Sequence, residues 1–202
     1  MRIGIDFDNT IACYDELFHK VALEQGLINN LTPANKVAVR DHMRSRGQEA
    51  DWTELQGVVY GKRMKEAAIF SGVLEFIAYA IERGDEVYII SHKTSHPVIG
   101  PRYDLHAAAR QWIEQNLIWD KALLLPSEQI FFKPTREEKL AQIERCGCDL
   151  FIDDLPEVLT SAAFPRQTEA ILFDPEGHHR LPDTLSFATW QEIMVYTGMD
   201  DS

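Results

Sequence analysis

Short apolar runs alternate along this chain with longer segments in which apolar residues recur at helical spacing. Such alternation is typical of an α/β chain. Each short run is rich in β-branched or aromatic residues and is bounded by polar ones, as buried parallel strands are. The sequence therefore predicts an α/β fold built on a parallel sheet of about five strands. The predicted strands are residues 3–7, 87–90, 130–132, 150–152 and 170–173.

The interval between the first two predicted strands is unusually long. It has room for about three helices, whereas a crossover between parallel strands needs one. Thr32-Pro33 within it is typical of a helix N-cap followed by proline. We therefore expect residues 14–69 to form a small helical cap, inserted into an α/β core of residues 1–13 and 70–202. Further helices are expected at residues 73–83, 105–115, 136–145 and 188–196.

Composition excludes some classes of protein. The net charge of −12 argues against nucleic-acid polymers as partners, because their binders normally show a basic face. Residues 11–70 differ from the rest, since they hold eight basic and eight acidic residues. No apolar stretch approaches the roughly 20 residues that span a bilayer, so no membrane partner is expected. Without a recognisable signal peptide, and with three scattered cysteines, the expected location is the cytoplasm.

Two carboxylates follow the first predicted strand. Asp6 and Asp8 are two residues apart, so in an extended segment they point the same way at the carboxyl end of the sheet, where open α/β sheets bind ligands. Carboxylates suit a hard cation such as Mg²⁺. One of them can act as a nucleophile toward phosphorus, and the other as a general acid and base.

Other polar residues end the later strands. Ser91, His92 and Lys93 follow the second predicted strand, and the Asp153-Asp154 pair follows the fourth. Clustered acids repel one another and raise their pKa values unless a cation or a lysine offsets them. Two lysines, Lys133 and Lys139, precede the fourth strand, and we favour Lys139 because it lies at a helix start. The order of nucleophile, hydroxyl, lysine and paired acids indicates a phosphoryl-transfer site.

These motifs resemble those of the haloacid dehalogenase-like (HAD) superfamily, over residues 3 to about 174. Asp6–Thr10 is similar to its DxDxT motif, Ser91 to its hydroxyl motif, Lys133 or Lys139 to its lysine, and Asp153-Asp154 to its acidic motif. The long helical interval matches the position of that superfamily's C1 cap. The resemblance implies a doubly wound, Rossmann-like sheet in which strands one and four are neighbours.

The resemblance also implies roles for these residues. Asp6 would be the nucleophile and a metal ligand, and Asp8 the acid and base and a ligand through its carbonyl. Asp154 would be the preferred third ligand, with Asp153 beside it. Contacts with substrate are expected from Thr10, Ser91, His92 and Lys93, with a plain loop charge as the alternative for Lys93.

A narrower likeness exists to the 5′(3′)-deoxyribonucleotidases. It rests on the helical cap, on a serine and a lysine in the second motif, on Ile152-Asp153-Asp154 and on the late Leu172-Phe173 strand. Trp112 also lies where those enzymes carry a tryptophan. Their catalytic lysine, however, lies just upstream of it, where this chain has Ala109 and Arg110. Motif one has Asn9 where glycine is common.

The sequence thus predicts a Mg²⁺-dependent phosphomonoester hydrolase that works through an aspartyl-phosphate. Its expected partner is a small phosphate ester, such as a (deoxy)nucleoside monophosphate. The alternatives are a sugar-phosphate phosphatase of the same fold, or a binding module that has kept the fold. A dehalogenase would need neither Asp8 nor the metal, and a sugar kinase would need glycine after Asp6. Asp153-Asp154 could also serve as an N-cap pair for the next helix.

The basic residues of the expected cap have two interpretations. Because the resemblance implies that the cap supplies selectivity, they could screen an anionic substrate from the acidic body of the protein. Alternatively, they form solvated helix faces paired with acids such as Asp41, Asp51 and Glu66. The six residues are Arg40, Arg44, Arg46, Lys62, Arg63 and Lys65.

Overall fold

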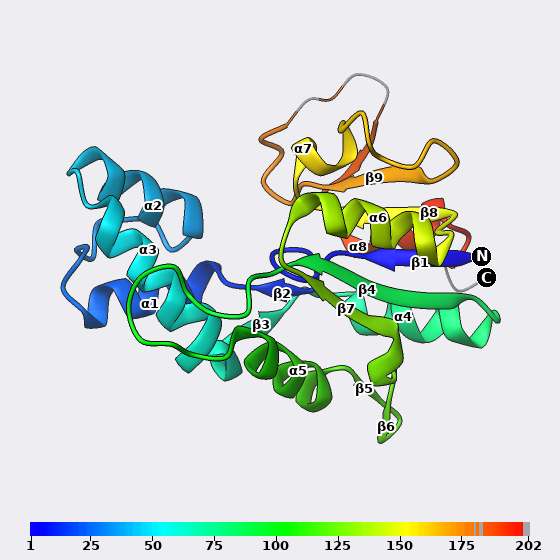
Figure 1. The fold of residues 1–202 in the computed structure, drawn as a ribbon, viewed down its shortest axis with the longest axis horizontal. Coiled ribbons are helices and arrows are strands. Elements are labelled where there is room, and N and C mark those ends of the chain that lie inside the picture. Colours follow the sequence, from blue (N-terminus) through cyan, green and yellow to red (C-terminus); the bar gives the residue numbers. More distant parts are fainter. Residues whose placement is uncertain (180, 182–183, 200–202) are drawn as a thin grey trace. The chain divides into compact units, whose positions relative to one another are not determined.

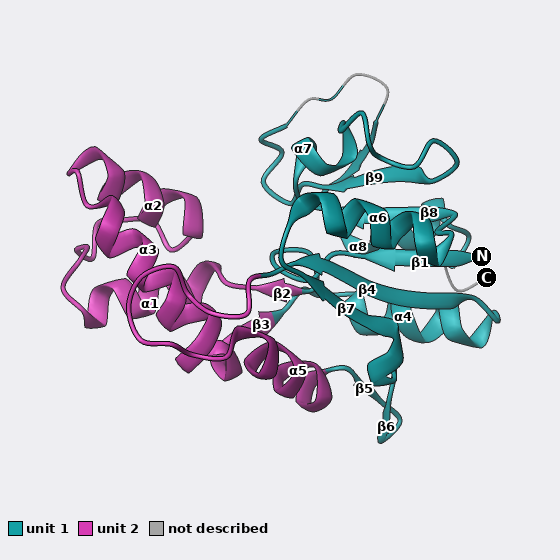
Figure 2. Ribbon diagram, viewed as in Figure 1, with its two compact units in different colours: residues 1–11, 69–93, 117–202 teal, residues 12–68, 94–116 magenta. Residues whose placement is uncertain are grey.

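The computed structural model describes residues 1–179, 181 and 184–199. The chain divides into two compact units (Figure 2). Unit 1 comprises residues 1–11, 69–93 and 117–202, and unit 2 comprises residues 12–68 and 94–116. Within the described residues no helix combines the length and apolar character needed to cross a membrane.

Unit 1 is built on a six-stranded sheet with the order β10-β9-β8-β1-β4-β7, in which every neighbouring pair is parallel (Figure 1). The α/β fold and the adjacency of the first and fourth predicted strands, now β1 and β8, are confirmed. The strands are β1 (Arg2–Ile5), β4 (Glu86–His92), β7 (Ile130–Lys133), β8 (Leu150–Asp153), β9 (Glu169–Phe173) and β10 (Leu185–Phe187).

The sixth strand, β10, is the one that the sequence did not predict. It has three residues, and two of them, Leu185 and Ser186, are exposed. It therefore carries no buried apolar run, and its parallel pairing with β9 is what defines it.

Helices cover both faces of this sheet, as in a doubly wound fold. On one face, Leu140 and Ile143 of α6 (Arg136–Cys146) pack with Ile90, Phe151 and Leu172 of the strands. The short helix α7 (Pro156–Leu159), which the sequence offered only as a helix that Asp153-Asp154 could cap, adds Val158 and Leu159 to this core. Its N-cap is Leu155, so neither aspartate occupies that position.

The opposite face packs against α4 (Val73–Glu82) and α8 (Trp190–Tyr196). Trp190 of α8 lies between Phe173 of β9 and Phe76 of α4, with ring centroids 5.6 and 4.9 Å away. Because Leu172 and Phe173 are neighbours in one strand and point to opposite faces, β9 is buried on both sides.

Two smaller features complete unit 1. The hairpin of β5 (Ile118–Trp119) and β6 (Ala122–Leu123) turns through Asp120 and Lys121, both with positive φ. The 3₁₀ helix η3 (Ser127–Gln129) leads into β7. Elsewhere β2 (Ala12–Cys13) and β3 (Ala68–Ile69) form a two-stranded sheet.

Unit 2 is helical. Its first helices pack together through an aromatic cluster. The rings of Phe18 and Trp52 stack with their centroids 5.0 Å apart, and the rings of Tyr14 and Phe18 each make an edge-to-face contact with Tyr60. Its helices are α1 (Asp15–Glu24), α2 (Lys36–Ser45), α3 (Glu49–Gly57), the π-helix η1 (Val58–Lys62), the 3₁₀ helix η2 (Met64–Glu66) and α5 (Leu105–Asn116).

The start of α2 differs from the sequence interpretation. Thr32-Pro33 does not cap it, because the helix begins at Lys36 and its N-cap is Asn35. The Asn35 side chain accepts a hydrogen bond from the backbone N–H of Ala38 at 2.7 Å. Asparagine is as good an N-cap as threonine, so the Thr-Pro pattern alone was misleading.

Residues 94–116, which the sequence assigned to the core, belong to unit 2 in the structure. The indole Nε1 of Trp112 in α5 donates to the Ala67 carbonyl at 2.9 Å. Close backbone approach matters as well, since a Cβ on Gly61 would lie 2.5 Å from Tyr103. These contacts join segments that are far apart in the sequence. The predicted cap of residues 14–69 did not include α5, which belongs to unit 2 in the structure. That this range acts as a cap remains a prediction.

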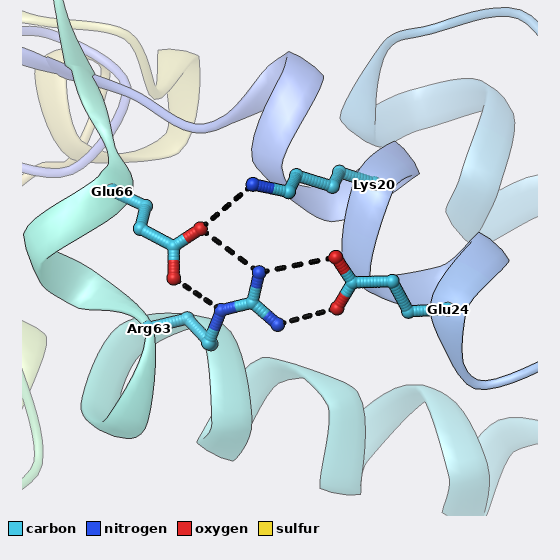
Figure 3. Close-up of polar contacts among 4 residues, drawn as sticks. All are labelled: Lys20, Glu24, Arg63 and Glu66. Carbon is cyan, nitrogen blue, oxygen red and sulfur yellow. Dashed lines mark hydrogen bonds and ion pairs between the residues drawn. The ribbon is translucent and has the colours of Figure 1, made fainter.

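An ion-pair network holds α1 to the segment after η1 (Figure 3). Arg63 is bound to Glu24, with Nη1 2.5 Å from Oε2, and to Glu66, whose Oε2 also accepts from Lys20 at 2.9 Å. The bidentate geometry favours arginine over lysine at position 63.

Half of the basic residues singled out in this region are therefore paired with acids on the same unit. Besides Arg63, Arg44 pairs with Glu49 and Arg40 with Asp41, each at 2.8 Å. These three fit the interpretation of solvated, paired helix faces. Among the described residues no ion pair is formed by Arg46, Lys62 or Lys65, which keep the substrate-screening interpretation open.

Gly4 in β1 provides a test of the packing between β1 and β8. A Cβ at this position would lie 2.5 Å from Cδ2 of Phe151. We expect Gly4→Ala to lower the free energy of unfolding by about 1–3 kcal/mol, because an overpacked core must shift. Urea denaturation measures the change, and Phe151→Leu added to Gly4→Ala should recover part of it. Full stability in the single variant would contradict this packing.

Candidate active site

The carboxyl ends of β8, β1 and β4 lie side by side because these strands are adjacent and parallel. Asp6 directly follows β1, and its backbone N–H donates to the Ile152 carbonyl of β8 at 2.9 Å. Asp153 ends β8, and Ser91 is the penultimate residue of β4. Residues that are more than 60 positions apart in the sequence therefore meet at one edge of the sheet.

A buried lysine joins two of these acids. The Nζ atom of Lys139 lies 2.5 Å from Oδ1 of Asp6 and 2.6 Å from Oδ2 of Asp153. All three side chains are at most 5% exposed. The charges sum to −1 when both acids are ionised, so the cluster is only partly neutralised.

The beginning of α6 positions this lysine. Thr135 caps the helix by accepting a hydrogen bond from the Glu138 N–H at 3.1 Å, so Lys139 lies in the first turn. Its ammonium group is 5.4 Å from the ring centroid of Phe151, in the same core. A lysine at a helix start just before the strand that carries Asp153 can therefore reach the edge of the sheet.

The other candidate lysine is placed differently. Lys133 ends β7, its carbonyl accepts from the Lys93 N–H at 2.8 Å, and its ammonium lies 5.7 Å from the ring centroid of Phe131. It forms no ion pair within the described part of the chain. The structure thus brings Lys139, and not Lys133, together with Asp6.

Burial dominates the electrostatics of the nucleophile candidate. Loss of hydration raises the pKa of Asp6 to about 7, against the opposing charge of Lys139, while Asp153 and Asp8 add to the rise. Burial by itself would lower the pKa of Lys139, but the charges of Asp153 and Asp6 outweigh it and raise that pKa. The lysine is therefore a permanent cation, whereas Asp6 is ionised at a cost.

The donor set at this edge fits a hard divalent cation. Asp6, Asp153 and Asp154 each offer a carboxylate oxygen, and these oxygens lie within 4.8 Å of one another. Both oxygens of Asp153 already accept hydrogen bonds, Oδ2 from Lys139 and Oδ1 from the Leu155 N–H at 3.0 Å. Oxygen-only ligands of this kind match Mg²⁺ better than softer metals.

Asp8 is paired with a lysine of its own. The Nζ atom of Lys93 donates to Oδ1 and Oδ2 of Asp8 at 2.9 and 2.8 Å. From the sequence, Lys93 was expected to be a loop charge or a contact for substrate, and not a partner of Asp8. The available signal was its spacing, because Lys93 lies two residues after Ser91 and points the same way if the extended conformation continues.

The remaining candidates are spread around this edge. The Ser91 side chain is buried, and so is that of Thr10, whose hydroxyl oxygen has no hydrogen-bond partner among the described residues. His92 is exposed, and its Nε2 donates to the Pro134 carbonyl at 3.1 Å, so the structure does not bring it to Asp6.

The backbone explains the unusual residue of motif one. Asn9 has φ = 62°, in the left-handed region. Glycine adopts this conformation freely, and asparagine tolerates it better than other residues do. Asn9 can therefore stand where glycine is common without breaking the turn after β1.

No protein-family model matches the chain, and no curated protein matches it in sequence. Solved structures do match it, and seven that cover nearly all of both chains are described as HAD hydrolases or dehalogenases. The chain has the HAD fold.

Three of these structures illustrate the likeness. A HAD-superfamily hydrolase from Ehrlichia chaffeensis is 17% identical with a TM-score of 0.53, over 98% of this chain and 96% of its own. The HAD hydrolase YfnB from Bacillus subtilis, bound to magnesium, is 15% identical with a TM-score of 0.55, over 96% and 97%. A HAD family hydrolase from Deinococcus radiodurans, with bound phosphate and sodium, is 13% identical with a TM-score of 0.58, over 98% and 94%.

The raised pKa of Asp6 leads to a prediction about stability. The folded state binds the Asp6 proton more tightly than the unfolded state does, so ionisation of Asp6 lowers the stability of the metal-free protein as pH rises from about 4 to about 7. Asp6→Asn removes this loss. We expect the variant to exceed the parent protein by about 2 kcal/mol in unfolding free energy at pH 8, in EDTA, and by little at pH 4.

Urea denaturation across this pH range makes the measurement. Glu114→Gln, which removes an exposed carboxylate of α5, serves as the control and should change little. An Asp6→Asn protein that is less stable than the parent at pH 8 would contradict the burial argument.

Proposed function

We propose that this protein hydrolyses phosphomonoesters in a Mg²⁺-dependent reaction that proceeds through phosphorylated Asp6. The observation that carries the proposal is the arrangement of Asp6 and Asp153 around the Lys139 ammonium, at the carboxyl edge of a sheet with the HAD fold. Asp8, two residues beyond Asp6, supplies a second carboxylate. Nucleophile, cation and acid–base group are thus all contributed by unit 1.

In the first half of the reaction, an Asp6 carboxylate oxygen attacks phosphorus, and the bond from phosphorus to the ester oxygen breaks. Asp8 gives its proton to that departing oxygen, so an alcohol leaves. The products are an acyl phosphate on Asp6 and an ionised Asp8. Lys139 holds the Asp6 carboxylate through one oxygen, Oδ1, and leaves the other for attack.

In the second half, water attacks the phosphorus of the acyl phosphate. Asp8 takes a proton from this water as the new P–O bond forms and the bond to Asp6 breaks. Inorganic phosphate leaves, and both aspartates return to their starting states. Each half uses the same proton carrier, so one residue serves as acid and then as base.

The residues that would hold the metal are Asp6 and Asp154, with the Asp8 carbonyl. Asp153 lies in the same cluster, but we assign it no direct bond to the metal, because its two oxygens already accept hydrogen bonds from Lys139 and from the Leu155 N–H. When bound, Mg²⁺ supplies positive charge against the phosphoryl oxygens. The magnesium of the Bacillus subtilis relative and the phosphate of the Deinococcus radiodurans relative support this proposal.

Asp8 also separates this proposal from its rivals. A dehalogenase of the same fold has no departing oxygen to protonate, and a binding module has no need of a buried, lysine-held carboxylate. For the substrate we propose a small phosphate ester, with deoxynucleoside monophosphates first and sugar phosphates second. We expect selectivity for the substrate to reside in residues 14–69. The chain departs from the nucleotidases at Ala109 and Arg110, where those enzymes carry their catalytic lysine.

Hydrolysis of p-nitrophenyl phosphate tests the proposed function. We expect release of p-nitrophenolate that requires Mg²⁺ and stops in excess EDTA, because the donor set is oxygen-only. Restored activity on adding back Mg²⁺ excludes damage by the chelator. Equal turnover in EDTA would reject the metal's role, and no turnover with Mg²⁺ of this ester or of a panel of phosphorylated metabolites would reject the function.

The two lysines are distinguished by substitution. Lys139→Ala should lower kcat/KM by about 10³-fold or more, because it leaves Asp6 and Asp153 without the cation that both contact. Lys133→Ala removes a side chain that lies against Phe131 and should cost less than about 10-fold. Circular dichroism of both variants checks folding. A larger loss in Lys133→Ala would reverse the assignment.

A further inference from the structure

Lys93 is a second buried lysine near the site, and it contacts a different acid from Lys139. Its side chain is 3% exposed, and the Asp8 side chain is 19% exposed. The ammonium donates to both carboxylate oxygens of Asp8, at 2.9 and 2.8 Å. The lysine is buried and the aspartate is partly buried, so their pairing depends on good geometry.

The surroundings of Lys93 fix its position. Its backbone N–H donates to the Lys133 carbonyl at 2.8 Å, which continues the pairing of β4 with β7. Its ammonium lies 5.5 Å from the ring centroid of Phe7, and the Phe7 ring contacts that of Phe132 at 5.8 Å. The backbone of Lys93 is thus held by the sheet, and its ammonium group is held by the Phe7 ring and by Asp8.

Asp8, by contrast, follows β1 in a turn. The Ile11 N–H donates to the Phe7 carbonyl at 3.1 Å, and Asn9 has left-handed φ. The terminal torsion of an aspartate side chain is broad, so the backbone alone leaves the plane of the carboxylate free to rotate. Two hydrogen bonds from one ammonium, one to each oxygen, remove that freedom. Proton transfer depends on such orientation, since reach and alignment both set its rate.

We propose that Lys93 is a positioning residue, which orients the Asp8 carboxylate for its two proton transfers. This inference rests on the proposed function. Lys139 serves Asp6, where the bond to phosphorus forms, and Lys93 serves Asp8, where the proton moves. Asp8 gives a proton to the ester oxygen as the alcohol leaves and regains one from water as phosphate is formed, and Lys93 keeps its own protons throughout. This role replaces the contact with substrate that the sequence suggested for Lys93.

The test compares two esters whose leaving groups differ in their need for a proton. p-Nitrophenolate leaves without protonation, whereas the alkoxide of a simple alkyl phosphate does not. The rate of leaving-group release is measured in the first turnover, with Mg²⁺ and excess enzyme, so that only the first half of the reaction counts. We expect Lys93→Met to slow the alkyl ester on the order of 10²-fold and p-nitrophenyl phosphate only a few-fold.

Three further variants sharpen the comparison. Asp8→Asn should show the same difference between the esters, and the double variant D8N/K93M should be no slower than D8N, because residues that act through one group are not additive. Lys93→Arg, which keeps two donors, should retain most of the alkyl rate. Lys121→Met removes an exposed lysine from the β5–β6 turn and should match the parent protein.

Stability separates positioning from a folding defect. Lys93→Met leaves the partly buried carboxylate of Asp8 without its cation, so this variant should unfold at lower urea than D8N/K93M. If Lys93→Met does not fold, the comparison of D8N/K93M with D8N carries the test. Equal slowing of both esters, with a raised KM and weaker inhibition by inorganic phosphate, would make Lys93 a phosphate ligand and overturn the proposal. So would unchanged rates with both esters.

The wild-type protein distinguishes the two levels of failure. If it releases neither leaving group, the proposed function falls and the role of Lys93 falls with it. If it turns over both esters while Lys93→Met keeps their ratio, only the role of Lys93 is rejected.

Discussion

The buried ammonium of Lys139 is the interaction on which the rest of the site depends. It touches Asp6 and Asp153, two carboxylates that would otherwise repel each other in an environment with little water. Parallel pairing of β1 with β8 brings the acids together, and a capped first turn of α6 brings the lysine. Removing the lysine would leave two uncompensated buried charges, and an arrangement of this kind is a poor choice for stability alone.

Burial of Asp6 in this arrangement disfavours its ionised form. Its pKa is raised to about 7 even with Lys139 beside it, so the metal-free fold holds the carboxylate of Asp6 in an unfavourable state when it is ionised. A cation bound by Asp6 and Asp154 would offset that charge, which couples metal binding to folding. The nucleophile that we propose is thus expected to reduce the stability of the metal-free protein.

Much of the fold and part of the site were predictable from local pattern. Short apolar runs located five of the six strands, and strand-end position singled out Asp6, Asp8 and Asp153. The three-residue, largely exposed β10 carries no such pattern. Local pattern also does not identify which side chains contact one another. Lys133 and Lys139 differ by six positions, and only the register of β7 and the start of α6 separate them. The grouping of α5 with the helices of unit 2 depends on contacts such as that of Trp112 with Ala67, which no run of residues encodes.

The proposed reaction requires a covalent bond between phosphorus and Asp6, and direct detection of that bond tests the proposal. The protein is mixed with substrate and Mg²⁺, quenched in acid within the first turnover and digested, and the N-terminal peptide is examined by mass spectrometry. We expect one added phosphoryl group on Asp6, lost on treatment with hydroxylamine and absent from Asp6→Asn. Turnover of substrate with no phosphoryl group on that peptide under any quench time, or with undiminished turnover in Asp6→Asn, would contradict it.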